Sequence, residues 1–248
     1  ELECLRRGSA IADRVGEQVR EIIRPGITEQ DIQKFVVEGL TRAGVAGGRI
    51  TCQSGVERSA DPIYYPVVSS RTLEAGDMLH MEINGSFDGY SIDICRSTVV
   101  GRASPEQRRL LGVTLEMLET TIAAIRPGIP AYSLGDVAGR VAERGGFARN
   151  FTLEYGGPAT YVGHGIGVSS DEPPVLALGD PTPLAEGMIL TIEPGLYRTP
   201  VGGCRIEDEV LVTGDGAEVV TALERIWWKC RTREMARWRE DFGVEGAV

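Results

Sequence analysis

The 248-residue chain has the composition of an ordinary globular protein, with 42% hydrophobic and 25% charged residues. Its formal net charge of −10 argues against binding to nucleic acid and against docking on an anionic membrane, because both need clustered Lys and Arg. No apolar run approaches the ~20 residues of a membrane span, and five scattered cysteines without a Cys-x-x-Cys pair indicate reduced thiols in a cytoplasmic protein.

The elements predicted along the chain occur twice in the same order. An amphipathic pattern predicts a helix over 2–23, Arg-Pro-Gly-Ile ends it, and a second helix follows. The same succession begins again with a helix over 105–125 and another Arg-Pro-Gly-Ile. Each unit continues with a Gly-led strand, a turn and a returning strand rich in Val, Ile and Thr, over 73–101 and 184–214.

This repetition predicts an α+β fold, in which two helix–helix–hairpin units are related by a pseudo-twofold axis and helices cover an antiparallel sheet. Chance similarity between two helix–turn–helix stretches is the alternative. We expect one domain over 1–248, with repeats at about 1–103 and 104–226 and a C-terminal tail at 227–248. Because the chain begins inside a predicted helix without Met, we also expect it to be a piece of a longer protein.

Acidic residues lie at matched positions in the two predicted hairpins. Glu82 and Glu193 each lie six residues after the glycine that leads their strand, and Asp93 and Glu207 lie on the returning strands. Each pair is centred on its predicted turn, so the two carboxylates should face each other with Cβ atoms about 4.5–5.5 Å apart. Facing carboxylates in an apolar sheet repel unless a cation lies between them. If the repeat brings both pairs together, a dinuclear metal site explains the four acids better than solvated outer-face positions do.

His164 is one of only two histidines and lies in "GHGIG". Glycines on both sides predict a backbone that approaches a ligand closely, and a neutral imidazole is a common metal donor, so His164 is expected to be the fifth ligand. The oxygen-rich set suits Mn or Fe, with Co or Zn as further candidates. Strand parity places Glu209 on the face of Glu207. The other histidine, His80, shares a strand face with Glu82, and we favour packing for it over a place at the border of the site.

Four stretches together resemble a known family: "GHGIG", "GMILTIEPGLY" and "CRIEDEVLVT", preceded by "GDMLHMEINGSFDGYSIDICRSTVVG". In this order and spacing they are similar to the creatinase, aminopeptidase P and methionine aminopeptidase family. Their residues most resemble those of its Xaa-Pro dipeptidase and aminopeptidase P branch. The resemblance runs from the first helix to about Ile226. It implies the pita-bread fold, a homodimer, and a separate N-terminal domain preceding Glu1.

The resemblance also implies a metal-dependent hydrolase acting on a small molecule or a short peptide. A metal-activated hydroxide would attack an amide or another C–N bond, and Glu193 would carry the proton to the leaving group. Such enzymes use two divalent ions, with Mn or Fe expected here. The five ligands implied are Glu82, Asp93, His164, Glu193 and Glu207.

Three positions depart from the family's pattern. Glu82 stands where the family has Asp, and Tyr64 and Asp171 stand where its peptidases have two substrate-handling histidines. The replacement at Tyr64 also disfavours the metal-free creatinase mechanism. An anionic Asp171 cannot stabilise an oxyanion, but it can hold a cationic substrate or act as a base. These departures favour a modified amino acid or another non-peptide substrate. The alternatives are a lyase or biosynthetic enzyme of the same fold, and a non-catalytic binding module.

Overall fold

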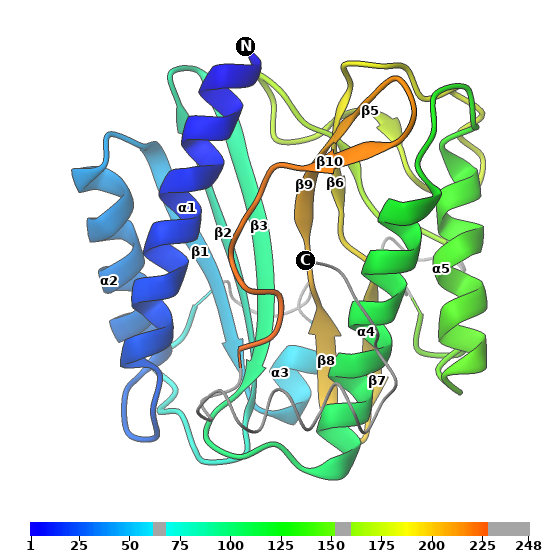
Figure 1. Cartoon of the computed structure of the whole chain (residues 1–248). Helices are drawn as coiled ribbons and strands as arrows, with labels where there is room; N and C mark the ends of the chain where they lie inside the picture. The colour runs from blue at the N-terminus through cyan, green and yellow to red at the C-terminus, as the bar shows by residue number, and fades with distance from the viewer. Residues whose placement is uncertain (62–67, 152–159, 228–248) are drawn as a thin grey trace.

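The computed structural model describes residues 1–61, 68–151 and 160–227 (Figure 1). Two halves follow each other along the chain, each with a helix pair that lies beside its own strands. The helices are α1 (Leu2–Ile22), α2 (Glu29–Arg42), α3 (Val56–Ala60), α4 (Pro105–Ala124) and α5 (Tyr132–Arg144). The strands are β1 (Ala46–Ser54), β2 (Met78–Phe87), β3 (Tyr90–Val99), β4 (His164–Gly165), β5 (Glu172–Val175), β6 (Ile189–Ile192), β7 (Gly195–Thr199), β8 (Gly202–Arg205), β9 (Asp208–Val212) and β10 (Ala217–Val219).

The predicted helix pairs are confirmed, with ends set by local chemistry. In each repeat the Pro-Gly of Arg-Pro-Gly-Ile ends the first helix, and the glycines adopt positive φ angles, +95° at Gly26 and +87° at Gly128. Capping boxes start α2 at Thr28 and α4 at Ser104, where each side chain accepts a hydrogen bond from the backbone three residues on. Short polar side chains at these positions therefore fix where the helices begin.

The described strands form three antiparallel sheets, with strand orders β1-β2-β3, β10-β9-β6-β4-β5 and β7-β8. One hydrophobic cluster joins α1 and α2 to β1–β3, and a second joins α4 and α5 to the later strands. The α+β fold class is confirmed. Strand β1 and helix α3 are absent from the sequence prediction, because 46–60 carries neither a clear alternation nor a helical repeat.

The predicted register of the first hairpin is wrong: the centre of its turn lies between Asp88 and Gly89, one residue later than predicted. The turn consists of Asp88 and Gly89, both with positive φ, so Phe87 pairs with Tyr90. Glu82 consequently faces Cys95, and Asp93 faces Asn84. Glu82 and Asp93 still share one face of the sheet, since the shift preserves strand parity, but they do not form a directly opposed pair.

The second predicted hairpin divides into two ladders. Ile192 pairs with Asp208 on one side of the division and Gly195 pairs with Arg205 on the other, so both pairs are centred on Pro200 as predicted. Nearer the turn the register shifts, and Thr199 pairs with Gly202. Pro194 lacks the N–H that a continuous ladder would use there. Glu193 and Glu207 therefore lie at opposed positions in the break, free of ladder hydrogen bonding to each other.

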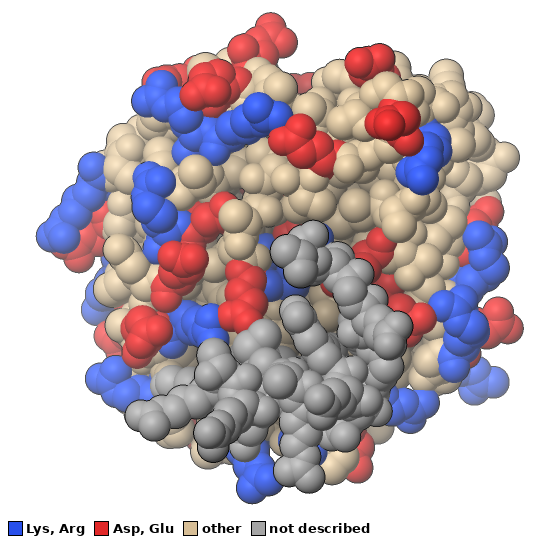
Figure 2. All heavy atoms as spheres, viewed as in Figure 1, with Lys and Arg blue, Asp and Glu red and all other residues tan. Residues whose placement is uncertain are grey.

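On the face shown in Figure 2, the basic and acidic side chains of the described residues are interspersed. Among the described helices, none is long and apolar enough to span a lipid bilayer.

Candidate metal centre

His164 is held on β4, a two-residue strand paired with β5 and β6. The glycines beside it serve strand packing: a Cβ at Gly163 would lie 2.0 Å from the carbonyl oxygen of Thr191, and one at Gly165 would lie 2.5 Å from that of Pro173. The expectation that these glycines admit a ligand is therefore corrected. They let neighbouring backbone come close, and this close packing fixes the position of the imidazole.

The imidazole of His164 faces three acids through Nε2. That atom lies 3.3 Å from Glu193 Oε1, 3.6 Å from Asp171 Oδ1 and 4.0 Å from Asp93 Oδ2. Nδ1 lies 2.9 Å from the carbonyl oxygen of Gly165, which can only accept, so the proton belongs on Nδ1 and Nε2 is available as a ligand atom. Burial lowers the pKa of His164, but the hydrogen bonds and charges of Glu193, Gly165 and Asp171 together outweigh it and the net shift is upward.

Asp93, His164 and Glu207 are buried, and each offers a ligand atom within 4.8 Å of the others. Burial raises the pKa of Asp93 and of Glu207 well above the ordinary values, and repulsion from the neighbouring carboxylates adds to the effect. Glu207 is 1% exposed, and neither of its carboxylate oxygens has a hydrogen-bond partner among the described residues. A divalent cation fits this group, because it would supply the missing partner and offset the repulsion.

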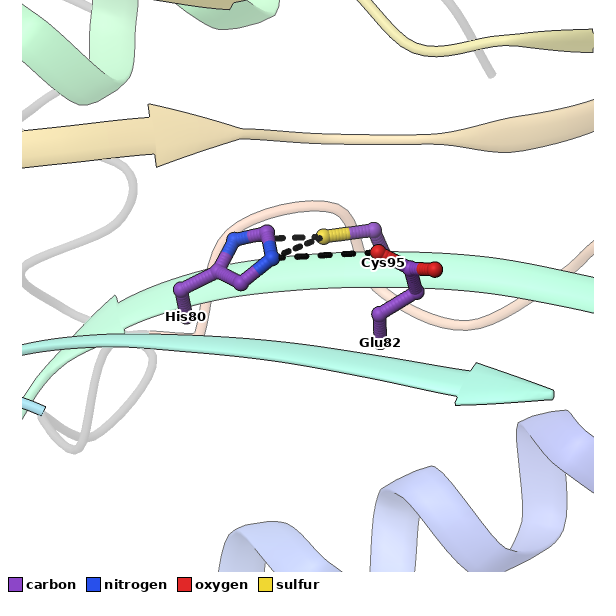
Figure 3. Close-up of side chains that lie close together, drawn as sticks. All are labelled: His80, Glu82 and Cys95. Atoms are coloured by element: carbon purple, nitrogen blue, oxygen red, sulfur yellow. Dashed lines mark hydrogen bonds and ion pairs between the residues drawn. The ribbon is translucent and has the colours of Figure 1, made fainter. Parts of the chain in front are cut away.

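Glu82 belongs to a different set of contacts. Its Oε2 accepts a hydrogen bond from Arg205 and lies 3.9 Å from Nε2 of His80, while Asn84 lies between it and Asp93 and donates to Asp93. Figure 3 shows Glu82 with His80 and Cys95, side chains from β2 and β3 that point toward one another. His80 is buried and contacts the predicted ligand Glu82.

Arg205 is a site residue that the sequence analysis did not identify. Its guanidinium is buried and lies between two predicted ligands, donating to Glu82 and placing Nε 3.5 Å from Oε2 of Glu193. Burial lowers its pKa. The sequence does contain one indication of this role. Arg205 precedes Glu207 by two residues, and residues two apart on a strand point to the same face of the sheet.

Tyr161 is a second residue that was not predicted. Its hydroxyl donates to Oε1 of Glu193 at 2.8 Å, the same oxygen that faces His164, and Thr191 Oγ1 lies 3.3 Å from that oxygen. These contacts hold the Glu193 carboxylate in one orientation. The only sequence signal was the position of Tyr161, three residues before His164.

The remaining predicted residues lie at the edge of the group or outside it. Asp171 has a side chain 71% exposed, and its Oδ2 accepts from Ser170. Tyr64 lies outside the described residues. Glu209 supports the site from behind: it accepts the backbone N–H of Asp93 at 2.9 Å and a hydrogen bond from Ser9, and burial raises its pKa to about 7.

A duplicated helix–helix–hairpin fold around buried carboxylates and one histidine defines a pita-bread protein with a candidate metal centre. A sequence model of metallopeptidase family M24 matches residues 3–214, and the chain belongs to this family. The predicted resemblance and the predicted fold are both confirmed.

Named relatives fall in the predicted branch of the family. The Xaa-Pro dipeptidase of Pyrococcus furiosus is 32% identical over 226 residues, which cover 91% of this chain and 62% of the relative. The solved structure of an X-Pro aminopeptidase from Thermotoga maritima matches with a TM-score of 0.83 and 27% identity, over 92% of this chain and 62% of that one. The prolidase structure from Pyrococcus furiosus has a TM-score of 0.82 and 31% identity, over 91% and 64%. The chain thus spans about three fifths of the length of these relatives.

Proposed function

We propose that this chain carries the catalytic site of a metal-dependent hydrolase that cleaves an amide or another C–N bond. The observation that carries the proposal is Glu207, whose two carboxylate oxygens are buried without a hydrogen-bond partner among the described residues, beside Asp93 and His164. Such a group is costly to bury unless a cation completes it. Membership of family M24 supports the same reading.

Asp93, His164, Glu193 and Glu207 would hold the ion or ions, with Glu82 as the fifth predicted ligand. We propose two divalent ions, with Mn or Fe favoured by the carboxylate-rich set around His164. When bound, such ions polarise the scissile group and lower the pKa of water so that it attacks at neutral pH.

Glu193 is the residue proposed to move the proton. Its Oε1 accepts from Tyr161 at 2.8 Å and faces Nε2 of His164 at 3.3 Å, so the carboxylate is oriented before substrate binds. Its Oε2 lies 3.5 Å from Arg205 Nε, which holds the second carboxylate oxygen in place. Glu193 would accept the proton of the attacking water and deliver it to the leaving nitrogen.

Asp171 is proposed to select the substrate. Its exposed carboxylate lies 3.6 Å from His164, and it adds a negative charge where the resemblance places a histidine. A substrate with a cationic group near the scissile bond would be attracted there, which favours basic or amino-substituted compounds over neutral Xaa-Pro dipeptides. A homodimer and a cytoplasmic location remain predictions; the four described cysteines are all free thiols.

The test begins with the metal content of the purified protein, followed by hydrolysis assays with added MnCl2 on Xaa-Pro dipeptides that carry basic, neutral or acidic Xaa. We expect bound metal, and cleavage that is fastest with basic Xaa. Asp171→Asn should reduce that preference, while its activity on neutral substrates changes little. A protein that binds no metal would refute the enzyme and favour the binding module. A protein that binds metal without cleaving any dipeptide would favour the non-peptide or lyase alternative.

A further inference from the structure

A second group of metal-ligand side chains lies on the first hairpin. Because Glu82 pairs with Cys95 across β2 and β3, and His80 precedes Glu82 by two residues, all three side chains emerge from one face of the sheet. Figure 3 shows them converging. The corrected register therefore brings an imidazole, a carboxylate and a thiol together, a combination that the predicted register does not contain.

The distances between the three side chains are close to those of a tetrahedral site. Nε2 of His80 lies 3.9 Å from Oε2 of Glu82 and 3.8 Å from Sγ of Cys95, and one ligand atom from each residue lies within 4.8 Å of the others. Zinc bonds of ~2.0–2.3 Å at tetrahedral angles separate ligand atoms by about 3.3–3.6 Å. The His80–Cys95 pair is within a few tenths of an ångström of such a separation, and the other two pairs would have to draw closer on binding.

Burial leaves few other roles for these side chains. His80 is 1% exposed and Cys95 is 0% exposed, and among the described residues the polar contacts of the His80 ring are Cys95 and Glu82.

We propose that His80, Glu82 and Cys95 bind a thiophilic divalent cation such as Zn²⁺ or Co²⁺, at a site distinct from the Asp93–His164–Glu207 group. The mixed nitrogen, oxygen and sulfur set favours these ions over Mn²⁺. The proposed site needs a fourth ligand, which in three-ligand zinc sites is a water molecule. Glu82 would then bind metal here instead of serving as the fifth ligand of the catalytic group, and the site does not require the proposed hydrolase activity.

The Cys95 thiol and the Arg205 contact of Glu82 are both compatible with a bound cation. Binding displaces the Cys95 thiol proton to solvent, and the metal then stabilises the thiolate. Arg205 contacts the same Oε2 of Glu82, but a carboxylate oxygen carries two lone pairs and can accept that hydrogen bond while it binds metal. Ligating carboxylates are commonly held by such outer hydrogen bonds.

The competing interpretation is a plain thiol–imidazole hydrogen bond between Cys95 and His80, since their Sγ–Nδ1 distance is 3.5 Å. The two interpretations differ in one observable. A thiolate bound to Co²⁺ gives an intense near-ultraviolet charge-transfer absorption, whereas carboxylate and imidazole ligands alone do not.

The experiment is a titration of the metal-free full chain with CoCl2, followed by absorption and by elemental analysis. We expect the charge-transfer band in the wild type, its loss in Cys95→Ser together with one equivalent of cobalt, and its retention in Cys204→Ser. Cys204 is the matched control because it is equally buried and lies on β8. His80→Gln should weaken cobalt binding at this site by more than ~10-fold, the loss seen even for outer partners of metal ligands.

Asp93→Asn separates this site from the proposed catalytic group. The band should persist in that variant, even if Mn²⁺-dependent hydrolysis is lost. Absence of the band in the wild type, whether or not cobalt binds, would overturn the proposal, and this result does not depend on the folding of any variant. Persistence of the band in Cys95→Ser would overturn it as well.

Discussion

Glu207→Gln should make the metal-free protein more stable near neutral pH. The Glu207 carboxylate is 1% exposed, and its oxygens have no hydrogen-bond partner among the described residues. An unsatisfied buried neutral group costs about 1–3 kcal/mol and a charged one costs more. Gln keeps the shape and removes the charge, so we expect a gain of about 1–2 kcal/mol. For a chain of this size that gain corresponds to about 2–8 °C in Tm.

The stability gained by Glu207→Gln should increase as pH rises. The pKa of Glu207 in the folded protein is raised well above its ordinary value of 4.5, mainly by burial, so the folded state holds a proton that the unfolded state releases. Wild-type stability therefore falls as pH rises above about 4.5 toward the raised pKa, and Glu207→Gln lacks this loss. The two proteins should be similar at the acidic end and diverge toward neutrality.

Added metal should reverse the order of stability. An ion present at 100 times its Kd stabilises the wild type by ~2.7 kcal/mol, or about 5–11 °C in Tm. Glu207→Gln has lost a charged ligand and should gain much less. Differential scanning calorimetry of chelator-treated protein, with and without MnCl2 between pH 5 and 8, measures both effects.

Glu209→Gln is the matched control for this experiment. Glu209 is equally buried, but its carboxylate accepts hydrogen bonds from Ser9 and from the backbone of Asp93. Its substitution should lower stability by about 1–2 kcal/mol and preserve most of the Mn²⁺ shift. If Glu207→Gln lowers Tm equally with and without Mn²⁺, Glu207 is an ordinary structural residue and the reasoning fails.

Two further substitutions test the support of the site. Tyr161→Phe removes the hydrogen bond to Glu193 and should lower kcat ~10–100-fold with little change in KM, measured by steady-state kinetics on a cleaved substrate; an unchanged kcat would contradict the role given to Tyr161. Gly163→Ala combines a φ of +145° with a Cβ 2.0 Å from the Thr191 carbonyl oxygen and should cost more than ~2 kcal/mol in thermal unfolding. Gly179→Ala, at φ +101° with open space, should cost only ~1 kcal/mol, and equal losses would contradict the packing argument.

The sequence predicts the helices and the convergence of acids because these depend on local and repeated features. Arg-Pro-Gly-Ile and the six-residue spacing from the leading glycine to Glu82 or Glu193 recur in both halves. The register of the first hairpin was wrong because its outcome depends on which two residues adopt positive φ. Once Asp88 and Gly89 do so, Cys95 rather than Asp93 faces Glu82.

Other features of the site depend on contacts between segments far apart in the sequence, and no periodic sequence pattern predicts such contacts. Arg205 connects Glu82 on β2 with Glu193 after β6, segments that the chain order does not make neighbours. Tyr161 reaches Glu193 only because β4 pairs with β6. The glycines around His164 indicate that some group comes close to the backbone there. The sequence does not reveal that this group is the backbone of a neighbouring segment and not a ligand.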